Sequence, residues 1–166
     1  LMGLVAENTS VSIQGTKLKT NGPLLVTHWG MSGPAILKLS AFGARILNLK
    51  NYNFNVQVNW INELNNEKIA NNLRDIIKSN PKKLITNNRP FNIPERLWLF
   101  LIEKGALSPT KIWGEIGKKG INKLVSLLSN DIYNIKGKTT FKEEFVTCGG
   151  ISLDDVELKT MESKVC

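Results

Sequence analysis

The spacing of hydrophobic residues changes twice along the chain, near residue 61 and again near residue 131. Before residue 61, short apolar runs and period-two alternation predict β-strands, most clearly at 53–60, where every second residue is valine or aromatic. Between 61 and 130 the hydrophobic period becomes helical, and strand patterns return afterwards. The sequence therefore predicts an α+β fold in which a helical block, 61–130, interrupts a β-lobe made of 1–60 and 131–166.

One short helix is expected within the first part of the β-lobe, at about 32–43. Ser32 is a favoured N-cap residue, and Pro34 is tolerated in the first turn because its missing N–H would have no helical partner. Gly43 is placed to end this helix. The lobe is expected to close as a small barrel, since closure removes exposed strand edges. Its strands are expected at 11–13, 24–26, 45–49, 53–60, 132–136, 144–147 and 149–153.

Four helices are expected in the helical block. An apolar stripe that includes Ile69 and Leu73 indicates the first, and Pro94 begins the second. Ser108 is placed to cap the third, which runs to about residue 117. A further stripe at 121–128 indicates the fourth.

The chain is basic, with a net charge of +8 over 166 residues. The helical block holds twelve lysines and arginines against six acidic residues, so it accounts for +6 of this charge. Because lysines on helix surfaces commonly form only a solvated face, nucleic acid is not the partner expected first. A basic nucleic-acid-binding β-barrel module stays open as an alternative.

Several function classes are excluded by motifs that the sequence lacks. It contains no G-x-G-x-x-G, P-loop or H-E-x-x-H motif, and Cys148 and Cys166 have no metal-ligand spacing, so no metal site is expected. The longest apolar run, 97–102, is too short to span a membrane, and the first residues lack a signal-peptide pattern. We therefore expect a cytoplasmic protein that is not a complete enzyme on its own chemistry.

The segment THWGMSG, 27–33, contains the one histidine of the sequence and a serine four residues later. His28 and Ser32 are typical of a nucleophile–base pair, but Pro34 stands where a nucleophile elbow has glycine, so a Ser/His hydrolase is the weakest alternative. Alternatively, Ser32, Gly33 and Pro34 form a structural corner, with His28 as a polar anchor at a strand end. A third interpretation is an anion or carbonyl site at the helix N-terminus, to which His28 adds a donor.

Two segments carry a resemblance to a known family. Residues 22–37, GPLLVTHWGMSGPAIL, resemble the "G-LLFTH-G-SGPAIL" segment of the BaiN-like (YhiN-like) family of bacterial FAD-dependent oxidoreductases. Residues 146–151, VTCGGI, followed by 158–164, LKTMESK, are similar to that family's "VT-GGV … TMESK". Trp29 and Cys148 depart from the residues usual at those positions of the family.

The resemblance implies that this chain is the inserted middle part of an FAD-dependent oxidoreductase. It would pack over a Rossmann-like FAD-binding domain built from residues outside the chain and help to shape the substrate side of the active site. The small-molecule substrate stays unidentified, and NAD(P)H is a candidate electron donor. The chain alone is expected to be inactive and to carry no FAD.

The resemblance also assigns expected site residues. His28 is a candidate catalytic donor to substrate or cofactor, whereas Ser32, Gly33 and Pro34 are structural. The residues expected near FAD in the whole protein are Thr147, Gly149, Gly150, Met161, Glu162 and Ser163.

Overall fold

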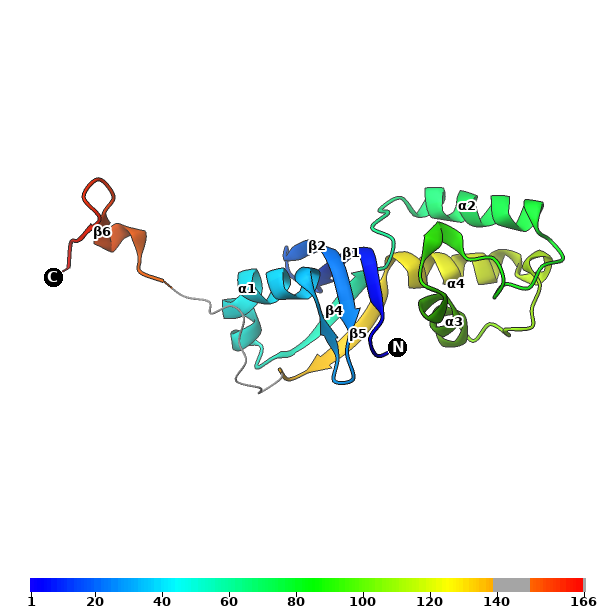
Figure 1. The fold of residues 1–166 in the computed structure, drawn as a ribbon, viewed down its shortest axis with the longest axis horizontal. Helices are drawn as coiled ribbons and strands as arrows, with labels where there is room; N and C mark the ends of the chain where they lie inside the picture. The colour runs from blue at the N-terminus through cyan, green and yellow to red at the C-terminus, as the bar shows by residue number, and fades with distance from the viewer. Residues whose placement is uncertain (139–149, 166) are drawn as a thin grey trace.

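A computed structural model describes residues 1–138 and 150–165. Within these residues the fold is α+β, as predicted: a curled five-stranded sheet carries one helix, and a block of three further α-helices lies beside it (Figure 1). The strand predicted at 144–147 and the residues Thr147, Cys148 and Gly149 lie outside the described residues, so these predictions stay untested.

The sheet is antiparallel and has the strand order β3-β2-β1-β4-β5. Val56 and Val58 of β4 point into the core, and Val58 is paired with Asp131 of β5. The two strands that flank the helical block are therefore hydrogen-bonded neighbours, so the block is an insertion between adjacent strands of one sheet. The strands are β1 (Val5–Ile13), β2 (Lys19–Val26), β3 (Met31–Ser32), β4 (Asn53–Asn59) and β5 (Asp131–Lys136).

Helix α1 (Pro34–Leu49) is longer than expected. The predicted strand at 45–49 is wrong, because those residues are the last turns of this helix. Gly43 does not end it: a Cβ there would lie 3.1 Å from Leu18 Cδ1, so glycine permits close packing against the sheet side. Ala35, Leu39, Gly43 and Leu47 recur every four residues and form its buried stripe.

The helical block contains α2 (Asn66–Ser79), α3 (Glu95–Lys104) and α4 (Gly117–Ser129), with short 3-10 turns at Pro90–Asn92 and Trp113–Glu115. The helix expected from Ser108 is absent from this described block. Instead, Ile112 bridges Leu84, and the Trp113 N–H donates to the Lys83 carbonyl at 2.9 Å. These contacts hold Ile112 extended against another segment and place the following 3-10 turn, and a local capping pattern cannot reveal such a partner.

The C-terminal residues form a small hairpin of β6 (Val156–Glu157) and β7 (Glu162–Ser163), preceded by a 3-10 turn at Leu153–Asp155. The strand expected at 149–153 is wrong for the described part of that range, since residues 150–152 have no regular structure.

Candidate functional site

The segment 27–33 forms a tight hairpin turn between β2 and β3. The Thr27 N–H donates to the Gly30 carbonyl at 2.8 Å, and the Gly30 N–H donates to Thr27 Oγ1 at 3.1 Å. His28 and Trp29 are the two central residues of the turn; both are exposed, and their rings meet edge to face at 4.0 Å. The turn therefore presents two aromatic rings on the surface.

Ser32 does not cap the helix, so that prediction is wrong. It lies in β3, where it is paired with Leu25, and the N-cap of α1 is Gly33, which makes no side-chain cap. Gly33 has a φ of 92°, and a Cβ there would lie 2.9 Å from both Leu25 N and Pro23 O. This corner depends on glycine, because no other residue type can adopt this backbone conformation and also allow two backbone segments to approach so closely.

The structure does not join His28 to Ser32. Among the described residues no hydrogen bond links the two side chains, and the Ser32 hydroxyl has no acceptor in that part of the chain. A nucleophile needs its base within hydrogen-bond reach. The geometry of the hairpin therefore does not favour the Ser/His hydrolase.

The described residues expected near FAD are all on the surface. Gly150, Glu162 and Ser163 are exposed, Met161 is 75% exposed, and a Cβ on Gly150 would meet no atom within 4 Å. None of them lines the cavity beside α4 or the one between β1 and β4 in the described part of the chain. These residues do not by themselves form a cradle that fits FAD, and no step of a flavin reaction follows from them.

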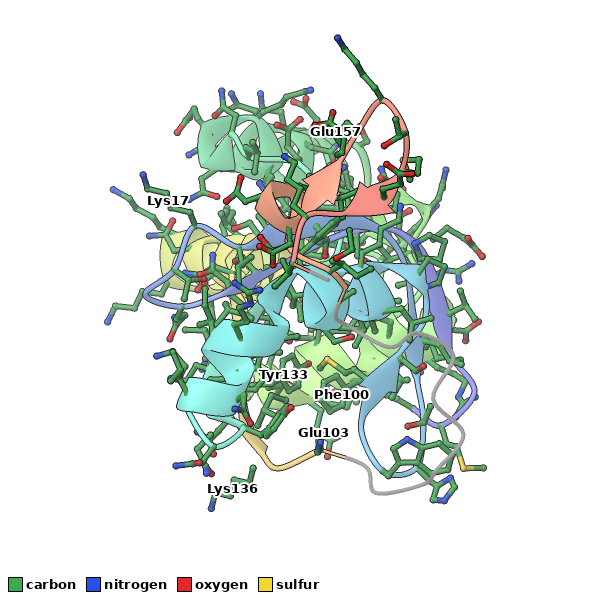
Figure 2. All side chains as sticks on the ribbon, turned by 90° about the vertical axis from the view of Figure 1, so that its left-hand side faces the viewer. Lys17, Phe100, Glu103, Tyr133, Lys136 and Glu157 are labelled. Atoms are coloured by element: carbon green, nitrogen blue, oxygen red, sulfur yellow. The ribbon has the colours of Figure 1, made fainter. Side chains whose placement is uncertain are left out.

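A buried carboxylate links the helical block to the sheet. Asp131 at the start of β5 is 2% exposed and accepts hydrogen bonds from Trp60 Nε1 at 3.0 Å and from the Tyr133 hydroxyl at 2.6 Å. Its other oxygen lies 2.5 Å from Lys104 Nζ at the end of α3. The Lys104 ammonium also lies 3.8 Å from the centre of the Tyr133 ring and 5.9 Å from that of Phe100, both labelled in Figure 2.

Burial raises the pKa of the Tyr133 hydroxyl well above its ordinary value of 10.0, and the hydrogen bond to the Asp131 carboxylate and its charge raise this pKa further. Tyr133 therefore stays neutral at every physiological pH, and its hydroxyl group donates a hydrogen bond to the Asp131 carboxylate. This cluster is not evident from the sequence, because Trp60 and Asp131 are 71 residues apart. One feature of the sequence could have indicated that Asp131 is buried: in a strand it lies on the same face as Tyr133 and Ile135, two residues apart in each case, and this face points inward.

A cavity of about 360 Å³ lies in the helical block, at the start of α4. Arg74 from α2, Trp113 from the 3-10 turn and Lys118 from α4 line it, so it combines two cations with an indole ring. The charge of the helical block is visible in the sequence, but nothing there distinguishes these residues from the rest of the block. They come from three separate elements, and only their packing brings them together.

None of the helices in the described residues combines the length and apolar character needed to cross a bilayer. In the same residues, no three His, Cys, Asp or Glu side chains gather closely enough to hold a metal ion.

A family model described as "HI0933-like protein barrel and H2TH domain" matches residues 1–146. Because this match covers most of the chain, the chain belongs to the HI0933-like family. The match confirms at the level of the family the resemblance to YhiN-like FAD-dependent oxidoreductases, while the narrower BaiN-like assignment stays a prediction. The barrel named in this family description agrees with the curled five-stranded sheet of the structure.

Two relatives carry the name "Ribosomal RNA dihydrouridine synthase". The protein from Haemophilus influenzae is 28% identical over 140 residues, which cover 84% of this chain and 32% of the relative. The protein from Escherichia coli is 24% identical over 164 residues, which cover 99% of this chain and 38% of the relative. The chain thus spans about a third of the length of these curated relatives.

Proposed function

From this family membership and the name of the two relatives, we propose that the chain is the barrel-and-helix part of a flavin-dependent oxidoreductase that acts on ribosomal RNA. In this proposal the chain supplies a surface that binds the RNA and a surface that packs against the flavin-binding part. The substrate is then uridine within RNA rather than the small molecule expected from the sequence. NAD(P)H remains the candidate electron donor.

The observation that carries this proposal is the unpaired positive charge of the helical block. Eight of its twelve lysines and arginines form no ion pair within the described residues. Phosphate groups are the ligands that such a surface attracts, and each phosphate contact releases a condensed counterion. The eight residues are Lys82, Lys83, Arg89, Arg96, Lys111, Lys118, Lys119 and Lys123.

A second surface is apolar. Phe42, Ile46 and Leu49 lie on the outer face of α1, where Phe42 is 73% and Leu49 is 82% exposed. Exposed apolar side chains gathered on one helix face are typical of an interface. We assign this face to the flavin-binding part, because about two thirds of the length of each relative has no counterpart in this chain.

The C-terminal hairpin is assigned to the same interface. It exposes Ile151, Leu153, Leu158, Met161 and Val165, each at least 64% accessible, and a segment this short cannot bury them by itself. The expected proximity of Gly150, Met161, Glu162 and Ser163 to FAD rests on this packing. When bound, the flavin would supply the hydride chemistry, while the protein orients the RNA.

The function is tested by deleting the gene in its natural host and measuring dihydrouridine in ribosomal RNA by mass spectrometry of the nucleosides. We expect the dihydrouridine content to fall and a plasmid copy of the gene to restore it. An unchanged content, with the deletion verified, would contradict the proposed substrate.

A further inference from the structure

We propose that the cavity at the start of α4, lined by Arg74, Trp113, Gly117 and Lys118, binds a phosphodiester group of the RNA backbone. This inference rests on the proposed function and names the place where the helical block holds the RNA. Four observations carry it: the free N–H groups of the helix, the charge of its first turn, an unpaired indole and the composition of the wall.

The N-terminus of α4 has free backbone donors. Among the described residues, no backbone carbonyl accepts from the N–H groups of Gly117, Lys118 or Lys119, and no side chain caps the helix. Ile116 is right-handed helical (φ −62°, ψ −39°) and Gly117 is left-handed (φ 64°). Successive right- and left-handed residues turn their N–H groups toward one point, which is an arrangement that binds anions.

The first turn of α4 carries positive charge, whereas helices usually begin with acidic residues. The first turn of α4 has no acidic residue and contains Lys118 and Lys119, whereas α2 begins with Glu67 and a capping Asn65 side chain. Lysines near the positive end of a helix dipole are unfavourable unless an anion lies between them and the helix. A bound phosphate would make the same residues favourable.

Trp113 gives an independent indication of a ligand. Its side chain is wholly buried and forms part of the cavity wall, and its Nε1–H has no hydrogen-bond acceptor in the described part of the chain. The ring stacks on Trp98 with 6.0 Å between centroids, and Trp98 Nε1 donates to the Ile85 carbonyl at 2.7 Å. Of two stacked buried indoles, one is satisfied by the protein and the other is not. Because the Trp113 side chain is covered, an acceptor bound in the cavity would reach this N–H group once the neighbouring side chains move apart.

The composition of the wall favours an anion with an attached sugar. No carboxylate is among the described residues that line the cavity, and Arg74, Lys118 and Asn122 offer donors. Arg74 is partly engaged, since it contacts Glu67 Oε1 at 2.9 Å and Asn71 Oδ1 at 2.6 Å. Ile77 and Ile121 add an apolar side. A volume of about 360 Å³ exceeds that of a phosphate group and leaves room for the ribose.

The first test compares Lys118→Glu with the matched control Lys123→Glu, which makes the same charge change on α4 outside the cavity wall. RNA affinity is measured by fluorescence anisotropy with a short labelled oligouridylate at several salt concentrations. We expect Lys118→Glu to weaken binding about tenfold and to reduce the salt slope by about one phosphate contact, and Lys123→Glu to weaken binding only about twofold.

Thermal melting separates binding from folding. A glutamate in the first turn favours the helix, so Lys118→Glu is expected to melt at or above the temperature of the unchanged protein. Lys118→Gln is the second variant and should show an intermediate loss of affinity. Equal affinities for the Lys118→Glu and Lys123→Glu variants would overturn the assignment of this cavity, while leaving the proposed function intact if the unchanged protein binds RNA.

The second test identifies the source of the phosphate by NMR. Adding the oligouridylate is expected to shift the amide signals of Gly117, Lys118 and Lys119 and the indole N–H signal of Trp113. Inorganic phosphate should produce the same shifts only at much higher concentration. If ADP shifts these signals more strongly than the oligouridylate does, the cavity is a free-nucleotide site and the inference is wrong. If the unchanged protein binds no RNA, the RNA-binding role proposed for the chain fails together with it.

Discussion

Lys104 of α3 and Asp131 of β5 form an ion pair, with 2.5 Å between Nζ and Oδ1, that joins the helical block to the sheet. The Lys104 side chain is 31% exposed and that of Asp131 is 2% exposed, so the pair lies at the edge of the core. Because Trp60 and Tyr133 donate to the second carboxylate oxygen, this oxygen is fixed as well. The cluster therefore holds the basic block in one orientation relative to the barrel.

We predict that Asp131→Asn lowers the free energy of unfolding by about 3 kcal/mol, because it removes the charge that Lys104 is paired with in a buried position. Urea unfolding followed by circular dichroism measures this value. Asp155→Asn, in an exposed 3-10 turn, is the control and should change stability by less than about 0.5 kcal/mol. A similar small effect at Asp131 would show that the ion pair is dispensable.

Tyr133 should make stability depend on pH in alkaline solution. Burial raises its pKa in the folded state, so above about pH 10 the unfolded chain loses this proton while the folded protein keeps it. Stability from this group is complete below about pH 10 and falls at higher pH by about 1.4 kcal/mol per pH unit. The measurement is the free energy of unfolding in urea across this range.

Tyr133→Phe is expected to cost about 1 kcal/mol at neutral pH and to remove this alkaline slope. Tyr52→Phe should leave the slope in place. A slope that survives Tyr133→Phe would mean that another group causes it.

Gly33→Ala should destabilise the protein by about 3 kcal/mol, since it combines backbone strain with a Cβ at 2.9 Å from two backbone atoms. Gly3→Ala is a matched control, because Gly3 also has a positive φ (78°) but open space around its Cβ position, so it should cost about 1 kcal/mol. Ser32→Ala should cost well under 1 kcal/mol, because Ser32 caps nothing. Equal losses for the two glycine variants would refute the close approach at Gly33.

Residues 1–166, purified alone, should bind FAD weakly and stay colourless. Gly150 and residues 161–163 are exposed, so one wall of a site would have to immobilise the whole cofactor. Titration of FAD followed by its fluorescence tests this. Tight, stoichiometric binding would place the cofactor site within this chain.

The outer face of α1 should contribute little to the stability of the chain itself. Phe42→Ser is expected to change the free energy of unfolding by less than about 0.5 kcal/mol, whereas Leu39→Ala, in the buried stripe, should cost about 3 kcal/mol. In the complete enzyme Phe42→Ser should lower retention of FAD on dilution. If retention is unchanged, α1 does not pack against the flavin-binding part.

The sequence by itself determined where strands give way to helices and where strands return, because that change depends on the local hydrophobic period. Alternation at 53–59 places β4, and the stripe through Ile69 and Leu73 places α2. The position of the helical insertion between two strands followed from the same change of period. Capping and turn chemistry were less decisive: Ser32 and Ser108 have suitable side chains but cap no helix.

Tertiary structure alone decided where the chain needs glycine and which charged groups meet. Gly43 looks like a helix end in sequence, yet it is buried within α1 because Leu18 packs against it. Lys104 and Asp131 are 27 residues apart, and the cavity at α4 draws Arg74 and Lys118 from different helices. A local pattern cannot specify such contacts, because they arise when separate elements pack and exclude water around the groups they bring together.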